Sequence, residues 1–207
     1  MYSSRKGLIL GFHGCDEQLR DEIISKKGVL LNESNNDYDW LGGGIYFWQN
    51  DANRALKFAD FLSNSSAHNK KQKIKIPAVL GAVIDLGYCL DLLDSEYLEL
   101  LNIGYKSLKT SETKHNITIP KNLPLKENGD LLIRYLDCAV IESIHQFNRD
   151  KKIEEFDSVR GVFFEGEELY PNAGFKKDNH IQIAIRNPNC IKGFFAPRTL
   201  DKSYRKI

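Results

Sequence analysis

The sequence predicts an α+β domain whose mainly antiparallel sheet is flanked by helices. Apolar, β-favouring segments lie both before residue 93 and after residue 160, whereas residues 95–149 carry mostly helical periodicity. We therefore expect a sheet built from both ends of the chain, with about 95–149 packed beside it as a helical insertion. The whole chain, 1–207, is expected to form a single domain, because 207 residues can bury a sufficient core without disulfides or metal.

The N-terminal third is expected to alternate strands and helices. A short apolar run predicts a buried strand that delivers His13 at its end. Asp16 is a suitable N-cap for the first helix, and Gly28 is placed to close it. The expected elements are a strand (8–12), a helix (17–26), a polar loop (32–39), an aromatic strand (45–48) and a helix (53–62).

The remainder is expected to hold one long strand, two helices and a C-terminal β block. The long strand is a nearly continuous apolar run, which is typical of a strand with neighbours on both sides. Pro120 and Pro124 indicate a loop between the two helices. The expected elements are strands (78–86, 89–92, 161–164, 180–185, 190–195), helices (95–108, 131–147) and loops (63–75, 109–128, 165–174).

Composition and charge argue against several classes of protein. Hydrophobic residues make up 42% and charged residues 28%, which is typical of a globular chain and not of a disordered one. The net charge of +1 gives no strong overall field toward nucleic acid or membranes. Four widely separated cysteines lack metal-ligand spacing, so no metal is expected. No leader or membrane-length apolar run is recognisable, and we expect a cytoplasmic protein with no membrane partner.

Two short motifs point to a nucleotide site. His13-Gly14 ends the first apolar run, and Gly42 to Gly44 precede Tyr46 about thirty residues later. Glycine lets a ligand approach the backbone, imidazole offers one donor and one acceptor to a ribose diol, and an aromatic ring stacks on a pyridinium ring. The glycines lack the spacing and the basic residue of a phosphate loop, which argues against an NTPase.

With these motifs and the helix that carries Ala55, the chain resembles the ADP-ribosyltransferase superfamily, in particular the branch that includes poly(ADP-ribose) polymerases. The resemblance implies a split, mainly antiparallel sheet with NAD as co-substrate in the cleft. It implies that His13 binds the ribose on the adenosine side, that the Gly14 backbone holds the nicotinamide carboxamide, and that the Tyr46 ring stacks on the nicotinamide. Further contacts to NAD are expected from Cys15, Gly44 and Trp40, the last as part of a lid with the loop before it.

The third anchor of that family, a Glu at the start of a late strand, is altered in this chain. Gln182 stands at the most natural position, where an amide can still bond ribose hydroxyls but cannot accept a proton or balance positive charge. Some toxin members of the superfamily keep an acidic residue in the preceding loop. Besides Tyr46 and Gln182, the candidate catalytic residues are therefore Glu165, Glu167 and Glu168.

The resemblance implies transfer of ADP-ribose from NAD to a macromolecular acceptor, protein or nucleic acid, with release of nicotinamide. Compact single-domain members resemble bacterial toxins and phage-defence effectors, so an antitoxin protein is a further expected partner. If the acceptor is RNA or DNA, phosphate contacts are expected at Lys70, Lys71, Lys73 and Lys75. Two alternatives stay open: an NAD glycohydrolase with water as acceptor, and a non-catalytic module that binds NAD or ADP-ribose.

Overall fold

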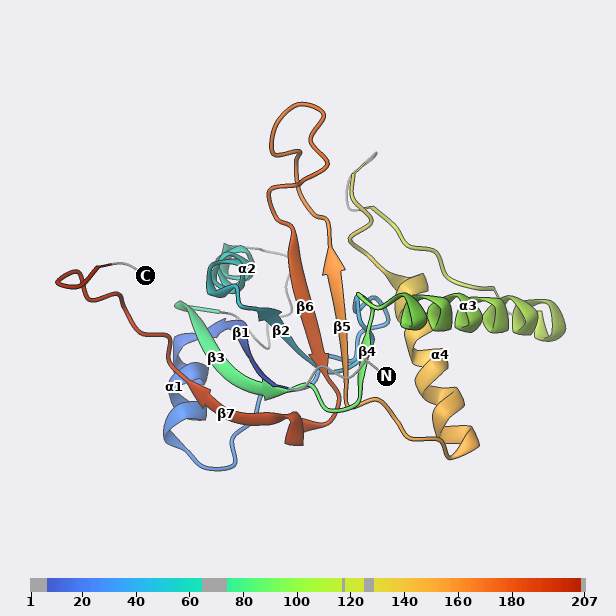
Figure 1. Cartoon of the computed structure of the whole chain (residues 1–207), viewed down its shortest axis with the longest axis horizontal. Coiled ribbons are helices and arrows are strands. Elements are labelled where there is room, and N and C mark those ends of the chain that lie inside the picture. Colours follow the sequence, from blue (N-terminus) through green and yellow to red (C-terminus); the bar gives the residue numbers. More distant parts are fainter. Residues whose placement is uncertain (1–6, 65–73, 117, 125–128, 206–207) are drawn as a thin grey trace.

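The computed structural model describes residues 7–64, 74–116, 118–124 and 129–205. These residues form a seven-stranded sheet in the order β4-β5-β6-β2-β1-β3-β7, with helices packed against it (Figure 1). All neighbouring strands run antiparallel except β4 and β5, which confirms the predicted α+β class with a mainly antiparallel sheet. The strands are β1 (Leu8–Asp16), β2 (Ile45–Gln49), β3 (Pro77–Asp85), β4 (Cys89–Asp91), β5 (Ser158–Phe163), β6 (His180–Ile185) and β7 (Ile191–Phe195).

Both ends of the chain contribute neighbouring strands, as the sequence predicted. Strand β6 pairs with β2 on one side and with β5 on the other, so the C-terminal strands extend the N-terminal half of the sheet. The helices are α1 (Glu17–Ser25), α2 (Ala52–Asn64), α3 (Ser95–His115) and α4 (Tyr135–Lys151). None of the helices within the described residues combines the length and the apolar composition needed to cross a bilayer.

Alternate residues of the strands face two separate cores. On β6, Ile183 and Ile185 pack into a first core together with Ile23 of α1. Between them, Ala184 points to the opposite face and packs into a second core together with Ile141 of α4. The sheet therefore has α1 on one face and α4 on the other, and the segment expected as a helical insertion supplies one wall of the second core.

Helix α3 is longer than predicted, so the predicted loop over residues 109–128 is wrong for residues 109–115. Lys109 and Glu112 form an ion pair one turn apart at 2.6 Å, and no glycine or proline interrupts the helix there. The helix ends where Asn116 takes a left-handed conformation with φ of 52°.

Helix α4 begins and ends about one turn later than the predicted range 131–147. Before it, the main chains of Leu123 and Ile133 exchange hydrogen bonds of 2.8 and 3.0 Å, which hold Ile133 in an extended bridge. The helix starts only after Arg134 and ends where Lys152 takes a left-handed conformation.

Strand β1 also extends beyond its predicted range, and His13 lies inside it instead of at its end. Pairing with β3 continues along the whole strand, from Leu8 opposite Asp85 to Asp16 opposite Pro77. Asp16 then caps α1 as predicted, because its carboxylate accepts a hydrogen bond of 3.0 Å from the amide of Gln18. The longer strand matters because it places the His-Gly motif within a sheet.

Candidate functional site

The two predicted motifs meet where the ladder between β1 and β2 stops. Among the residues that the structure describes, the last pair of this ladder is Phe12 with Trp48. Beyond it, β1 keeps its pairing with β3 but has no ladder partner on β2. In the same register Gly14 would stand opposite Tyr46, so the two motifs lie on either side of a gap in the sheet, which we call the β1–β2 gap.

The side chain of His13 bridges the β1–β2 gap. Its Nδ1 lies 2.7 Å from the carbonyl oxygen of Tyr46. Because a carbonyl only accepts, Nδ1 carries the hydrogen and Nε2 keeps a lone pair. Burial lowers the pKa of His13, and the bond to Tyr46 opposes that shift in part, so the ring is neutral near pH 7. A neutral imidazole is thus fixed beside the gap, and it makes an edge-to-face contact with the ring of Phe47.

Gly14 faces the same gap with its main chain. The amide of Asn50 donates to the carbonyl of Leu10 at 2.9 Å, so the main-chain groups of Leu10 point toward β2. Those of Phe12 and Gly14 point the same way, because directions alternate along a strand. At Gly14 the ladder has already stopped, which turns its N–H and C=O toward the gap. A Cβ at Gly14 would lie 2.1 Å from the carbonyl oxygen of Ala55, so only glycine allows α2 to pack this closely.

Tyr46 is held in place by its hydroxyl group. The hydroxyl donates to the carbonyl of Gly42 at 2.7 Å and accepts from the amide of Leu41 at 2.8 Å. The half-buried ring packs against the second core, and burial raises the pKa of Tyr46 well above its ordinary value. Gly44, which precedes β2, has a φ of 153°, and a Cβ there would lie 2.8 Å from the carbonyl of Ile185. The glycine segment and the Tyr46 ring therefore form one rigid unit.

Gln182 lies on the same face of the sheet as Tyr46. In the ladders it stands opposite Trp48 of β2 and Gly161 of β5. Its half-buried side chain makes no hydrogen bond to any residue within the described ranges. The amide is therefore available to a ligand on this face.

The three glutamates between β5 and β6 differ in environment. They lie in a loop that projects beyond the end of the sheet (Figure 1). The Glu165 carboxylate lies 2.6 Å from the Arg54 guanidinium of α2, and its side chain is 19% exposed. The Glu167 side chain is 83% exposed and pairs with a lysine of the loop, and Glu168 accepts a hydrogen bond from the amide of Asn172. Of the three, Glu165 alone is drawn back toward α2 and the sheet.

Trp40 is anchored between three parts of the chain. Its Nε1 donates to the carbonyl of Leu132 at 2.8 Å, and the guanidinium of Arg134 lies 4.7 Å from its ring centre. Its ring also packs against Phe163 of β5 and His180 of β6, with centres 4.6 and 6.0 Å apart. Trp40 therefore joins an aromatic cluster at the loop end of β5 and β6, and its role in a lid stays a prediction.

Cys15 points into the first core, away from Gln182. It is 4% exposed, and burial raises the pKa of its thiol to about 11. A thiol in this state is a poor nucleophile. Within the described ranges, the His, Cys, Asp and Glu side chains form no group that could hold a metal ion.

Two residues near the proposed site were given no role from the sequence: His180, on the same face of β6 as Gln182, and Arg54 of α2. Strand alternation could have found His180, because it lies two residues before Gln182 and thus shares its face. Arg54 could not be found in this way, since its contact with Glu165 joins residues that are distant in sequence. Of the lysines considered for phosphate contacts, Lys75 is exposed, and the other three lie outside the described residues.

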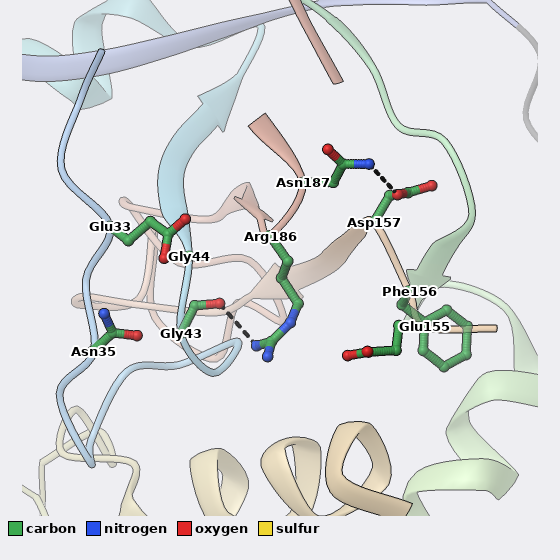
Figure 2. Close-up of a pocket in the computed structure, with 9 residues that line it drawn as sticks. All are labelled: Glu33, Asn35, Gly43, Gly44, Glu155, Phe156, Asp157, Arg186 and Asn187. Atoms are coloured by element: carbon green, nitrogen blue, oxygen red, sulfur yellow. Dashed lines mark hydrogen bonds between the residues drawn. The ribbon is translucent and has the colours of Figure 1, made fainter. Parts of the chain in front are cut away.

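A separate pocket of about 310 Å³ opens at the other end of β2 (Figure 2). Arg186 donates to the carbonyl of Gly43 at 2.9 Å and pairs with Glu142 of α4 at 2.6 Å. Three carboxylates line the pocket, which disfavours the diphosphate of a dinucleotide. The lining residues are Glu33, Asn35, Gly43, Gly44, Glu155, Phe156, Asp157, Arg186 and Asn187.

Comparison with known proteins finds a distant relative of similar length. The chain is 24% identical over 213 residues to the uncharacterized protein MJ0359 of Methanocaldococcus jannaschii, covering 92% of this chain and 89% of that protein. No family model matches the chain, and no solved structure matches it. The relative carries no described activity, so the geometry of the site is what supports a function.

Proposed function

We propose that this protein transfers ADP-ribose from NAD to a macromolecular acceptor and releases nicotinamide. The observation that carries the proposal is the β1–β2 gap. There, the main-chain N–H and C=O of Gly14 face an opening beside the neutral imidazole of His13. A strand that offers one donor and one acceptor side by side is complementary to a carboxamide, which is the group that nicotinamide presents.

The side chains of His13 and Tyr46 offer further contacts to NAD. Nε2 of His13 accepts a hydrogen bond from a ribose hydroxyl, because Nδ1 is already committed to Tyr46. The Tyr46 ring, fixed by its hydroxyl, offers a preorganised face to the positively charged nicotinamide ring. Gln182 supplies an amide to the second ribose from the same face of the sheet. These residues bind and orient the dinucleotide, and none of them is a strong base.

The order of elements around the gap agrees with the resemblance to ADP-ribosyltransferases. The first motif lies on β1, the second leads into β2 and then α2, and the late strand with Gln182 pairs with β2. The narrow contact between β1 and β2 corresponds to the split that the resemblance implies. We therefore assign the NAD cleft to the β1–β2 gap, where His13 and the main chain of Gly14 lie, together with the adjoining face of the sheet that carries Tyr46 and Gln182.

The proposal extends to the acceptor and the setting. A protein or a nucleic acid is the proposed acceptor, an antitoxin is a proposed partner, and the cytoplasm, where NAD and reduced thiols occur together, is the proposed location. Ion pairs balance the basic residues near the cleft, as in Arg54 with Glu165 and Lys57 with Asp178. Local charge therefore favours neither class of acceptor.

The experiment that tests this function is intact-mass analysis. The protein is incubated with NAD together with cell extract or total RNA, and nicotinamide release is followed in parallel. ADP-ribose attached to a macromolecule supports the proposal, whereas free ADP-ribose alone indicates a glycohydrolase. Binding of NAD without nicotinamide release indicates a binding module, and no binding at millimolar NAD overturns the assignment of the site.

A matched pair of variants makes the result specific to the β1–β2 gap. Tyr46→Ala removes the ring and should weaken NAD binding. Gly193 lies on β7, the distant edge strand, where an added Cβ meets nothing within 4 Å. Gly193→Ala should therefore bind NAD like the wild type. Equal NAD binding by wild type and Tyr46→Ala would place the ligand elsewhere.

A further inference from the structure

His180, the first residue of β6, is enclosed by aromatic rings. It is 7% exposed. The rings of Trp40 and Phe163 lie nearly parallel to it, with centres at 6.0 and 5.6 Å, and the ring of Trp48 lies at 6.4 Å. Because His180 and Gln182 are two residues apart on one strand, both side chains project from the face that carries the proposed NAD cleft.

The hydrogen bonds of His180 leave one ring nitrogen as an unused acceptor. Its Nδ1 lies 2.7 Å from the carbonyl oxygen of Asp178, so Nδ1 carries the hydrogen and Nε2 keeps its lone pair. Nε2 is buried and has no partner among the described residues. Such groups are rare in folded proteins and point to a catalytic role or a polar ligand.

Two unused donors lie close to the same ring. Nε1 of Trp48 and Nε of Arg54 are also buried without a partner in the described part of the chain. The guanidinium carbon of Arg54 lies 5.8 Å from the centre of the Trp48 ring. The acceptor on His180 and the donor on the neighbouring Trp48 ring, whose centre lies 6.4 Å from that of His180, suit a hydroxyl, an amino group or a water molecule, each of which both donates and accepts.

The carboxylate of Glu165 lies on the Nδ1 side of the His180 imidazole. Oε2 of Glu165 lies 3.8 Å from Nδ1 of His180 and 2.6 Å from the Arg54 guanidinium. Burial is the main cause that lowers the pKa of His180; the bond to Asp178 opposes it, and the charge of Arg54 adds to the lowering. The charged groups that face His180 are Arg54 of α2, Asp51 just before α2, Glu165 after β5 and Arg134, which lies over the flanking Phe163 and Trp40 rings.

We propose that His180 is the general base that deprotonates the acceptor in the proposed transfer of ADP-ribose. This inference rests on the proposed function, and it fills the role that the amide of Gln182 cannot perform. Glu165 is a positioning residue that stabilises the imidazolium once it forms, and Arg54 holds that carboxylate in place. Glu167 and Glu168, which point into the exposed loop, have no part in the step.

The step balances in atoms and charge. The bond between ribose C1′ and the nicotinamide nitrogen breaks, and its electron pair leaves with neutral nicotinamide. An oxygen or nitrogen lone pair of the acceptor forms the new bond to C1′, and the acceptor proton passes to Nε2 of His180. The imidazolium then releases that proton to solvent. The positive charge of NAD therefore ends as one proton in solution.

The variant His180→Asn separates this role from a purely structural one. An asparagine can keep the donor to Asp178, because its Nδ2 occupies a place similar to Nδ1, but it has no counterpart of Nε2. We expect nicotinamide release in the presence of acceptor to fall about 100-fold or more, with the NAD dissociation constant unchanged within about threefold. The activity of the wild type should fall as the pH drops through the lowered pKa of His180. This fall is the acidic limb of the pH profile, and His180→Asn should lack it.

A second variant keeps the inference falsifiable if His180→Asn fails to fold. Glu165→Gln preserves an acceptor for Arg54 but removes a negative charge from beside the imidazole. The pKa of His180 should fall further, so the acidic limb should move to lower pH. Glu167→Gln is the matched control in the same loop, and the acidic limb of its pH profile should lie at the same pH as in the wild type.

The outcomes distinguish the inference from the function on which it rests. If His180→Asn keeps the turnover of the wild type, or if the acidic limb of the pH profile does not move in Glu165→Gln, the role of His180 is overturned. The transferase proposal then still stands. A wild type that neither binds NAD nor releases nicotinamide overturns both. Loss of turnover in His180→Asn with intact NAD binding and a shifted limb in Glu165→Gln supports the assignment.

Discussion

Nδ1 of His13 donates to the main-chain carbonyl of Tyr46 at 2.7 Å, so a side chain joins β1 to β2 where the main-chain ladder between them has stopped. The bond has two consequences. It keeps the strands at a fixed spacing without closing the gap between them, and it leaves Nε2 as the acceptor of the ring. The two motifs recognised in the sequence are therefore coupled through a backbone contact that their side-chain chemistry alone did not indicate.

The first prediction separates the two nitrogens of His13. His13→Asn can keep a donor to Tyr46 but lacks Nε2, whereas His13→Ala loses both. We expect NAD affinity to fall about tenfold in each variant, the value of one hydrogen bond of about 1.4 kcal/mol. The free energy of unfolding should fall only in His13→Ala. Calorimetric titration with NAD and urea unfolding provide the two measurements, and wild-type NAD affinity in His13→Asn would exclude Nε2 from the site.

The second prediction concerns the packing of α2 on Gly14. In Gly14→Ala the new Cβ would lie 2.1 Å from the carbonyl oxygen of Ala55, a backbone atom that can move only if α2 moves. We expect the free energy of unfolding to fall by about 3 kcal/mol. Gly193→Ala is the control, expected within about 0.5 kcal/mol of the wild type. Urea unfolding of both variants checks the difference, and equal stability would contradict the close packing of α2.

The third prediction concerns the hydroxyl of Tyr46. Tyr46→Phe keeps the ring but leaves the amide of Leu41 and the carbonyl of Gly42 without their partner. Because Leu41 is fully buried, the free energy of unfolding should fall by about 1–3 kcal/mol. NAD binding should fall less than in Tyr46→Ala, since the ring performs the proposed stacking. Thermal unfolding with and without NAD measures both effects, and weaker NAD binding by Tyr46→Phe than by Tyr46→Ala would argue against stacking.

The sequence predicted the sheet and α2 well because the controlling patterns are local. The aromatic strand after the glycines and the helix that follows are each defined within about a dozen residues. Helix α3 was predicted too short, because an ion pair between Lys109 and Glu112 supports a polar segment that looks like a loop by hydropathy alone. Polarity indicates exposure, and an exposed segment can still be helical.

The candidate site was predicted in part, for a related reason. His13, Gly14 and Tyr46 carry short-range motifs, so their types and spacing sufficed to select them. Strand alternation already relates His180 to Gln182, but Arg54 became a candidate only through contacts between distant segments, such as the 2.6 Å ion pair that joins it to Glu165. Such contacts depend on how β2, β5 and β6 are ordered in the sheet, which no local pattern states.

His145 of α4 gives the last prediction, on how stability depends on pH. It is completely buried, and both ring nitrogens lack a hydrogen-bond partner among the described residues. Burial, followed by the charge of Arg186, lowers the pKa of His145 to about 4, although Glu142 opposes the shift. The folded protein therefore keeps this imidazole neutral at pH values where an unfolded chain, with a pKa of about 6.5, takes up a proton.

The sign of the effect follows from that difference. Between about pH 6.5 and 4 the unfolded chain binds a proton that the folded chain does not, so the free energy of unfolding falls as pH drops through this window. The contribution of His145 is on the order of 3 kcal/mol by the lower end. His145→Leu, an apolar replacement of similar size, should lose much less stability than the wild type between pH 7.5 and pH 4.5. Urea unfolding at both values measures it, and parallel losses in the two proteins would mean that His145 takes up its proton in the folded state as readily as in the unfolded chain.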